Sequence, residues 1–312
     1  MRRLKTQVIV NPESNQGRTR RRWKEIKETI RSFIHEFSFD FTEKPLQAIE
    51  LTRSAIKGGH DLIIGVGGDG TMNEIANGFF EGQDIINPES AMGILPSGTG
   101  SDLSRSLNIP KGWRDALKVI TQAPCAYIDV GRVTFRDPSG QESERFFLNV
   151  ADFGVGGEVV RRVNQQRLER KASSYIKCLV SAMVNYRSRR VRIRVDGRDL
   201  PEDEYLIGAI ANGRIFGKGM KVAPQARLDD GLFDLVLVKG MKFFEFCRHG
   251  WKILLGTHLS HPKISLVHGR RIEAVTAEEP GDVLLELDGE QLGTLPATFE
   301  IVPRRFPVKG YV

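Results

Sequence analysis

The sequence predicts two domains, an N-terminal α/β domain with a mostly parallel sheet and a C-terminal domain of antiparallel sheet. Up to residue 125, short apolar runs alternate with amphipathic segments, which is typical of parallel strands joined by helical crossovers. Beyond that point strand-like runs dominate. The 312 residues suit two modest domains. We place the domains at 1–125 and 126–297, and we expect 298–312 to return to the first.

The elements of the first domain follow from apolar periodicity and from signals at helix ends. Strands are expected where short apolar runs occur, at 6–10, 39–41, 61–66 and 91–95. Helices are expected at about 18–37, 45–57 and 72–80, with another after the glycine-rich segment near residue 100. The second helix can begin at Pro45 and stops at Gly58-Gly59.

The elements of the second domain are mainly strands, expected at 126–135, 146–151, 190–195, 205–211, 233–238, 270–275, 282–287 and 297–302. One amphipathic helix is expected at about 168–187. Asp196-Gly197 and Asp288-Gly289 are typical of tight hairpin turns. No internal repeat is visible.

Composition narrows the class of protein. The formal charge of +7 favours anionic partners such as nucleotides, nucleic acid or an acidic membrane surface, or serves solubility alone. Three widely spaced cysteines are typical of a reducing cytoplasm. The first residues have no apolar signal-peptide core, and no apolar run approaches a membrane span. We expect a cytoplasmic protein.

The main functional signal is GVGGDGT at 65–71, a strand followed by a glycine-rich turn and a helix. Such a turn brings backbone N–H groups and the positive end of a helix close to a phosphate. Asp69 would repel that phosphate unless a cation lies between them or Asp69 holds ribose or the loop. Thr71 is expected to cap the helix, with Glu74 at the capping-box spacing. A plain strand-to-helix turn is the alternative.

Two further polar turns follow predicted strands. GILPSGTGSDLSR contains Gly98, Thr99 and Gly100 before a helix capped by Ser101 or Asp102, and Asn11-Pro12 begins a third turn after the first strand. Parallel strands end at the same edge of a sheet, so these turns can hold one nucleotide together. None of them matches the P-loop or Rossmann fingerprints.

These motifs resemble those of the diacylglycerol kinase catalytic family, specifically the bacterial lipid kinases related to sphingosine and ceramide kinases. The resemblance spans nearly the whole chain, in family order. The matching segments are NPESNQG at 11–17, FTEKPLQA at 41–48, GGDGTMNE at 67–74, PSGTGSDLSR at 96–105, FLNVADFGVGGEVV at 147–160, ANGRIFGKGMKVAPQARLDDGLFDLVLV at 211–238 and LELDGEQLG at 285–293.

The resemblance implies a fold and a set of site residues. The N-terminal domain would be similar to that of NAD kinases and phosphofructokinases, and the C-terminal domain would be a β-sandwich. Glu290 would be the catalytic base, with Asp69 in the phosphate turn. A structural Mg²⁺ would use the Asp230 side chain and main-chain oxygens of Arg227 and Leu232. The ATP contacts would be Asn11, Pro12, Glu13, Ser14, Asn15, Thr42, Gly67, Gly68, Asp69, Gly70, Thr71, Met72, Asn73 and Thr99.

Three positions depart from the family pattern. Asn15 and Lys218 stand where the family usually has glycine, and Ser101 stands where it usually has asparagine in GTGND. The first and third departures touch the nucleotide edge and put the geometry of the phosphate loops in doubt. They remove no group that the chemistry requires.

Other features have two interpretations. The basic run at 161–171 is either a solvated helix face or a docking site for anionic lipid. No nucleic-acid-binding motif accompanies it, so we expect no nucleic-acid partner. Phe243, Phe244, Phe246 and Trp251 are expected in the core, with a lipid gate as the alternative.

We therefore expect an ATP-dependent lipid kinase that docks transiently on the membrane. Diacylglycerol is the first choice of acceptor, which would give phosphatidic acid. The alternatives are a kinase of a soluble substrate, of the NAD-kinase type, and an inactive nucleotide- or lipid-binding regulatory protein. A homodimer is left open.

Overall fold

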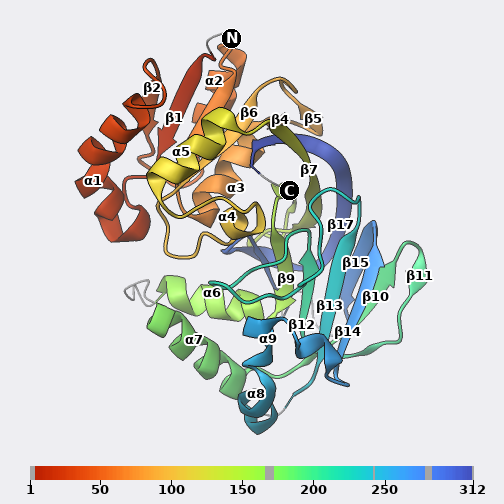
Figure 1. The fold of residues 1–312 in the computed structure, drawn as a ribbon. Helices are drawn as coiled ribbons and strands as arrows, with labels where there is room; N and C mark the ends of the chain where they lie inside the picture. The colour runs from red at the N-terminus through yellow and green to blue at the C-terminus, as the bar shows by residue number, and fades with distance from the viewer. Residues whose placement is uncertain (1–3, 166–171, 242, 278–282, 311–312) are drawn as a thin grey trace. The chain divides into compact units, whose positions relative to one another are not determined.

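The computed structural model describes residues 4–165, 172–241, 243–277 and 283–310. The chain divides into two compact units, unit 1 with Met1–Asp129 and Arg304–Val312, and unit 2 with Val130–Pro303. The chain passes from one unit to the other within two long strands, β7 (Cys125–Arg136) and β17 (Glu290–Lys309) (Figure 1). The boundaries expected from sequence, at residues 125 and 298, fall inside the same two strands.

Unit 1 contains a sheet and the helices that follow its strands. Its strands are β1 (Thr6–Val10), β2 (Ser38–Phe41), β3 (Leu62–Gly67), β4 (Phe80–Glu81), β5 (Asp84–Ile85) and β6 (Ala91–Pro96). Its helices are α1 (Ser14–Arg31), α2 (Gln47–Lys57), α3 (Asp69–Gly78), α4 (Asp102–Ser106) and α5 (Trp113–Gln122). β4 and β5 form a separate antiparallel pair.

The sheet of unit 1 has the order β2-β1-β3-β6, with the end of β17 beside β6. All of these pairs are parallel, as the alternation of strands and helices predicts. The helices lie close to the strands where a strand carries glycine: a Cβ atom on Gly65 of β3 would lie 2.7 Å from both Met72 and Ile75 of α3. Because β1, β2, β3 and β6 are parallel, the turns that follow them lie at one edge of the sheet.

Two helices of unit 1 differ from the expected ranges. The segment assigned to α1 starts at Ser14, but Asn15, Gln16 and Gly17 have left-handed torsion angles, so the regular helix starts at residue 18 as expected. The helix ends at Arg31 rather than near residue 37. α3 begins at Asp69 with Gly68 as N-cap, so the expectation that Thr71 caps this helix is wrong.

Unit 2 contains most of the strands. They are β8 (Glu142–Phe147), β9 (Val150–Gly154), β10 (Arg189–Val195), β11 (Arg198–Asp199), β12 (Asp203–Ala211), β13 (Phe233–Lys239), β14 (Ile264–Gly269), β15 (Arg271–Thr276) and β16 (Leu284–Leu287), together with parts of β7 and β17. Its helices are α6 (Val155–Gln165), α7 (Ala172–Asn185), α8 (Phe243–His249), α9 (Lys252–Leu255) and a 3₁₀ turn, η1 (His258–Ser260).

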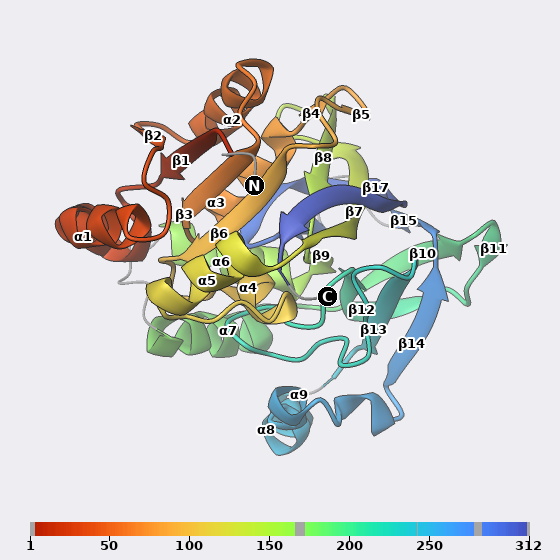
Figure 2. The ribbon, with the colours of Figure 1, turned by 45° about the horizontal axis from the view of Figure 1, so that its top comes forward.

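The strand pairs described within unit 2 are antiparallel (Figure 2). Their apolar side chains meet in a large core that includes Phe147, Phe153, Phe233 and Phe299. A second cluster lies between β12, β13 and the loop around Val222 and Ala226. A third joins α6 and α7 to Leu206 of β12.

Several elements of unit 2 were not expected from the sequence. The run at 146–151 is split into β8 and β9, and α6, α8, α9, β11 and β14 were missed. The sequence did not indicate α6 because this helix contains Gly156 and Gly157, and glycine normally disfavours a helix. Both glycines are needed for close packing, because their Cβ atoms would lie 2.2 Å from an Asp152 carboxyl oxygen and 2.7 Å from the Leu284 Cβ atom. Part of the helix expected at 168–187 is α7, and residues 166–171 lie outside the described residues.

The two predicted hairpin turns are confirmed. The φ angles are +48° at Asp196 and +80° at Gly197, and +47° at Asp288 and +95° at Gly289. Two successive positive φ angles are the signature of the type I′ turn that matches strand twist. No helix within the described part of the chain is long and apolar enough to cross a membrane.

Candidate functional site

Unit 1 brings the three glycine-rich or polar turns to one edge of its sheet. Asn11 directly follows β1, Gly68 follows β3, and Ser97 follows β6. Main-chain hydrogen bonds join these ends, since Asn11 N–H donates to the Val66 carbonyl and Ser97 N–H to the Gly67 carbonyl, at 3.0 and 2.9 Å. The polar side chains that follow each strand are therefore neighbours, as the parallel topology requires.

Side-chain hydrogen bonds fix the first turn to the other two. The Asn11 side-chain amide donates to the Thr71 hydroxyl at 3.0 Å, linking the turn after β1 to α3. The Ser14 hydroxyl lies 2.6 Å from that of Thr19, which lies 2.5 Å from that of Ser97. These hydroxyls are buried, so the chain of hydrogen bonds holds the turn after β6 against α1. The roles of Thr19 and Ser97 were not anticipated from the sequence.

The two glycine-rich turns touch each other through their backbones. A Cβ atom placed on Gly98 would lie 2.5 Å from the Gly68 Cα atom, which is closer than any side chain permits. A Cβ atom on Gly67 would lie 2.6 Å from the Thr71 hydroxyl oxygen. Glycine at these positions therefore serves close backbone approach, and these two residues add no side chain of their own beside the start of α3. This is a cradle that a phosphate can enter.

Asp69 connects the same two turns through its carboxylate. Its Oδ1 atom accepts the Leu103 main-chain N–H at 3.2 Å, which lies in the first turn of α4. Of the roles considered from sequence, holding a loop is therefore visible in the geometry. Asp102, the first residue of α4, is buried and forms an ion pair with Arg105 at 2.9 Å.

The remaining expected nucleotide contacts differ in exposure. Thr99 is exposed, Gly70 and Thr42 are half-buried, and the Thr42 N–H donates to the Val10 carbonyl at the end of β1. Met72 and Asn73 are buried, the first against Gly65 and the second against Asn77, so their side chains belong to the core of unit 1. In the first turn Pro12 is buried, whereas the exposed Glu13 forms an ion pair with Arg20 at 2.9 Å.

Glu74 does not complete a capping box. Its Oε2 atom accepts the Ala48 main-chain N–H at 3.2 Å, at the start of α2. The carboxylate therefore satisfies a donor at the N-terminus of a neighbouring helix instead of its own. The capping-box motif takes Thr71 as the N-cap, but the N-cap is Gly68, so the helix begins three residues earlier than the motif assumes.

The three departures from the family pattern share one backbone feature. Asn15, Ser101 and Lys218 have φ angles of +53°, +57° and +68°. This left-handed region favours glycine, and asparagine tolerates it better than most residues. The departures therefore keep the backbone geometry that the family residues favour, at some conformational cost for serine and lysine.

In unit 2, a carboxylate holds the β16–β17 hairpin in place. Asp288 accepts the main-chain N–H groups of Leu148, Asn149 and Val150 at 3.0, 3.1 and 3.1 Å. These bonds replace ladder hydrogen bonds at the point where the expected strand 146–151 is interrupted. Asp288 therefore has a structural role in the turn that precedes Glu290.

Two buried carboxyl groups lie in and beside this hairpin. Asp152 of β9 is opposite Glu286 of β16 in the antiparallel register. Burial raises the pKa of Asp152 to about 6, and burial together with the negative charge of Asp152 raises the pKa of Glu286 well above its ordinary value. Two adjacent buried carboxyls cannot both ionise without a large penalty, so we infer that they share a proton. The sequence signal was a carboxylate within each of two apolar strands.

Glu290, the expected catalytic base, is the first residue of β17 and is half-buried. It pairs with Leu287 across the hairpin, directly after the turn that Asp288 anchors. The backbone next to Glu290 is thus fixed by the hydrogen bonds that Asp288 accepts from Val150 of β9 and from Leu148 and Asn149, which precede β9.

The turn at 227–232 has the donor chemistry expected for a hard cation. Asp230 is exposed, and its Oδ1 atom accepts the Leu232 N–H at 3.1 Å. Gly231 has a φ angle of +73°, and Asp229 forms an ion pair with Arg227 at 3.2 Å. A carboxylate and main-chain carbonyls in a tight turn suit Mg²⁺. Within the described ranges, no three His, Cys, Asp or Glu side chains gather as a metal site.

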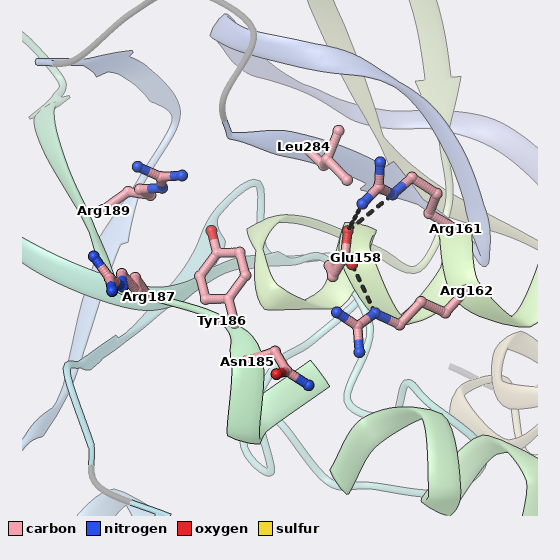
Figure 3. A pocket seen from close by; sticks show the side chains of 8 residues that line it. All are labelled: Glu158, Arg161, Arg162, Asn185, Tyr186, Arg187, Arg189 and Leu284. Carbon is pink, nitrogen blue, oxygen red and sulfur yellow. Dashed lines mark hydrogen bonds and ion pairs between the residues drawn. The ribbon is translucent and has the colours of Figure 1, made fainter. Parts of the chain in front are cut away.

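A basic pocket of about 370 Å³ lies in unit 2 between α6, the end of α7, β10 and β16 (Figure 3). In the figure Arg187 and Arg189 lie on one side of Tyr186, and Arg161 and Arg162 lie on the other. Glu158 forms ion pairs with Arg161 at 2.6 Å and with Arg162 at 2.7 Å. These are the first two basic residues of the run at 161–171, and residues 166–171 of that run lie outside the described residues.

Comparison with known proteins identifies the family. A model of the diacylglycerol kinase catalytic domain matches residues 5–133. A second model, the YegS C-terminal NAD kinase beta sandwich-like domain, matches residues 149–309, more than half of the chain. The chain belongs to the diacylglycerol kinase family and is by family a kinase, that is, a phosphotransferase.

Individual relatives match over nearly the full length. A diacylglycerol kinase of Staphylococcus saprophyticus is 26% identical over 306 residues, which is 95% of this chain and 92% of the relative. One from Staphylococcus aureus strain RF122 is 27% identical and covers 98% and 92%. A candidate diacylglycerol kinase structure from Bacillus anthracis strain Sterne superposes with a TM-score of 0.76 at 25% identity, covering 98% and 96%. Yeast NADH kinase shares the fold at 11% identity, with a TM-score of 0.51.

The buried pair Asp152–Glu286 predicts a pH dependence of stability. Both pKa values are raised in the folded protein, so the pair's contribution is present below the unfolded pKa near 4 and is lost as pH rises through about 6 and above. Glu286→Gln supplies a permanent N–H donor in place of the shared proton. We expect the variant to lose less stability than the parent between pH 5 and pH 8, measured as Tm.

The partner substitution serves as the control. Asp152→Asn should reduce the same pH dependence, and the double variant should not add the two effects, because both act on one proton. Parallel Tm profiles for the parent and both single variants would show that the carboxyls do not share a proton.

Proposed function

We propose that the protein transfers the γ-phosphoryl group of ATP to the hydroxyl of a membrane lipid, with diacylglycerol as acceptor and phosphatidic acid as product. The observation that supports this most is the close approach of the Gly68 and Gly98 backbones, where the turn before α3 meets the turn after β6, in a member of the diacylglycerol kinase family. The near-full-length relatives with that name support the choice of acceptor.

Each unit has a distinct part in the proposed reaction. Unit 1 would hold the ATP phosphates at the turns after β1, β3 and β6, where N–H groups and the start of α3 neutralise negative charge. In unit 2, Glu290 would accept the proton of the lipid hydroxyl as its oxygen bonds to the γ-phosphorus and ADP leaves. Mg²⁺, when bound, would neutralise phosphate charge.

A second cation has a structural part in the proposal. Asp230 would hold it with main-chain oxygens of Arg227 and Leu232, at the turn before β13. The fit rests on the oxygen donors of that turn and on the left-handed Gly231. We also propose a cytoplasmic protein that binds an anionic membrane surface transiently, because its lipid acceptor would reside there.

The acceptor class can be tested directly. Purified protein with γ-labelled ATP, Mg²⁺ and a total lipid extract is expected to produce a labelled lipid that co-migrates with phosphatidic acid. Label transferred to NAD instead would favour the NAD-kinase type of function. Nucleotide binding without turnover on either acceptor would favour a regulatory protein.

Asp69→Asn should keep the fold but lose most of the turnover. Asparagine retains an oxygen that can accept the Leu103 N–H, but it removes the negative charge with which Asp69 would hold the Mg²⁺ that accompanies the ATP phosphates. We expect kcat/KM for ATP to fall by about two orders of magnitude, the range typical of a lost electrostatic contribution. Asp115→Asn is a matched control, since Asp115 also lies in the first turn of a helix. A folded Asp69→Asn enzyme with the parent's kcat/KM would remove Asp69 from the mechanism.

Glu290→Gln should bind ATP and lipid as the parent does and should lose kcat by at least about two orders of magnitude, because glutamine keeps the shape but cannot accept the proton. Glu142→Gln, at the exposed start of β8, is the control for charge removal in unit 2. A Glu290→Gln enzyme within about threefold of the parent kcat, with chemistry shown to be rate-limiting, would rule out this base.

Asp230→Ala should shift the Mg²⁺ dependence of activity and that of Tm together, because one cation would support the shape of unit 2. Asp229→Ala removes a charge from the same turn and should leave both Mg²⁺ titrations close to those of the parent. If the Mg²⁺ titrations of activity and of Tm are the same for Asp230→Ala and the parent, the turn does not hold the cation.

A further inference from the structure

The connection between β13 and β14 is much longer than the strands require. These strands are direct antiparallel neighbours, and Val238 already pairs with Ile264. A tight hairpin could join them, yet the chain forms α8, α9 and η1 in between. Figures 1 and 2 both show α8 and α9 beyond the ends of β13 and β14. Long excursions of this kind commonly have a function of their own.

Contacts on its inner side hold this segment in place. Phe246 packs against the apolar cluster of α6 and α7. The Lys221 N–H donates to the Ile253 carbonyl at 3.0 Å, and the buried His258 bonds the Val222 carbonyl at 3.0 Å. Lys263 pairs with Glu245 at 2.6 Å. The segment is thus anchored to unit 2 by these contacts, while other side chains of the segment are exposed to solvent.

Four large apolar side chains of this segment are exposed. The exposed fractions are 84% for Phe244, 55% for Trp251, 56% for Leu254 and 61% for Leu255. The expectation that Phe244 and Trp251 are core residues is therefore wrong, whereas Phe246 does pack inside; the Phe243 side chain is outside the described residues. We call Phe244, Trp251, Leu254 and Leu255 the α8–α9 surface. Large apolar side chains gathered in one exposed segment mark an interaction site.

The charges around this surface favour an anionic lipid bilayer as its occupant. Arg248 and Lys252 lie within the same segment, and its acidic residue Glu245 is already paired with Lys263. Exposed tryptophan and leucine flanked by basic residues are typical of segments that lie in the membrane interface. Basic side chains near such a surface add attraction to anionic headgroups.

The basic run at 161–171 is a weaker candidate for the same role. The two of its arginines whose side chains are described, Arg161 and Arg162, are engaged with Glu158 in the pocket of Figure 3. Charge compensated within the protein attracts a membrane less than unpaired charge does. The α8–α9 surface, in contrast, combines exposed apolar area with basic neighbours.

We propose that the α8–α9 surface inserts into the interface of an anionic membrane and thereby brings unit 2 to its lipid acceptor. The choice of a bilayer over a protein partner rests on the proposed lipid kinase function. Salt screens charge attraction but does not weaken apolar insertion in this way. Binding should therefore persist in part at high salt, which distinguishes this surface from a purely electrostatic docking site.

The test is a binding measurement without nucleotide, so it does not depend on turnover. Vesicles of phosphatidylcholine with phosphatidylglycerol are titrated into the full chain, and bound protein is measured by co-sedimentation. Phe244→Ser/Leu255→Ser should reduce partitioning by about tenfold or more, because two apolar side chains lose their transfer free energy. Leu46→Ser/Tyr127→Ser, which changes two exposed apolar residues of unit 1, should bind as the parent does.

A second arm separates charge from insertion. Arg248→Gln/Lys252→Gln should weaken binding and flatten its salt dependence, whereas Arg190→Gln/Arg192→Gln, on the exposed arginine face of β10, should not. In vesicles with bromine-labelled acyl chains, tryptophan fluorescence should be quenched in the parent and much less so in Trp251→Phe. Quenching and binding that are unchanged in the α8–α9 variants would overturn the proposal.

Sedimentation equilibrium addresses the competing occupant, a second copy of the chain. If Phe244→Ser/Leu255→Ser abolishes a dimer but leaves vesicle binding unchanged, the surface is a subunit interface and the proposal is wrong. The variants change exposed residues and the half-buried Lys252, so Tm should remain close to that of the parent. Lipid phosphorylation measured separately on a short-chain monomeric acceptor shows whether the catalytic function fails independently of docking.

Discussion

The backbone contact between Gly68 and Gly98 is the constraint on which the candidate nucleotide site depends. Because the two turns approach to a distance that no Cβ atom permits, the start of α3 and the loop after β6 form one surface. The Asp69 carboxylate and the buried hydroxyls of Ser14, Thr19 and Ser97 then hold this arrangement through hydrogen bonds. A side chain at Gly98 would separate the groups that these bonds join, because its Cβ atom would lie 2.5 Å from the Gly68 Cα atom.

The sequence was informative where one local pattern determines the structure. Parallel strands, the turns that follow them and the two Asp-Gly hairpins were all predictable, because apolar runs and glycine positions act over a few residues. Long-range contacts were not predictable in the same way. Thr71 does not cap α3 because the helix begins at Asp69 with Gly68 as N-cap, and Glu74 instead accepts a hydrogen bond from Ala48 of another helix. The helix α6 was not expected because Gly156 and Gly157, which serve packing against Asp152 and Leu284, are unusual inside a helix.

The departures from the family pattern show what a single sequence can and cannot reveal. Comparison with the family motifs identifies Asn15, Ser101 and Lys218 as unusual, but their shared left-handed backbone is visible only in the structure. At such positions the main cost of replacing glycine is conformational, and an asparagine lowers that cost by local hydrogen bonding. The substitutions therefore change the energy of the loops more than their shape, which is compatible with an intact phosphate cradle at the edge of unit 1.

The acidic residues around the β16–β17 hairpin have different roles because their surroundings differ. Asp288 accepts three main-chain N–H groups, and these hydrogen bonds fix the turn. Asp152 and Glu286 are buried side by side, and their raised pKa values favour a shared proton. Glu290 lies one residue beyond the anchored turn and is half-buried. An acceptor of a substrate proton has to be both held in position and accessible, and of these four carboxyls only Glu290 combines a fixed backbone with partial exposure.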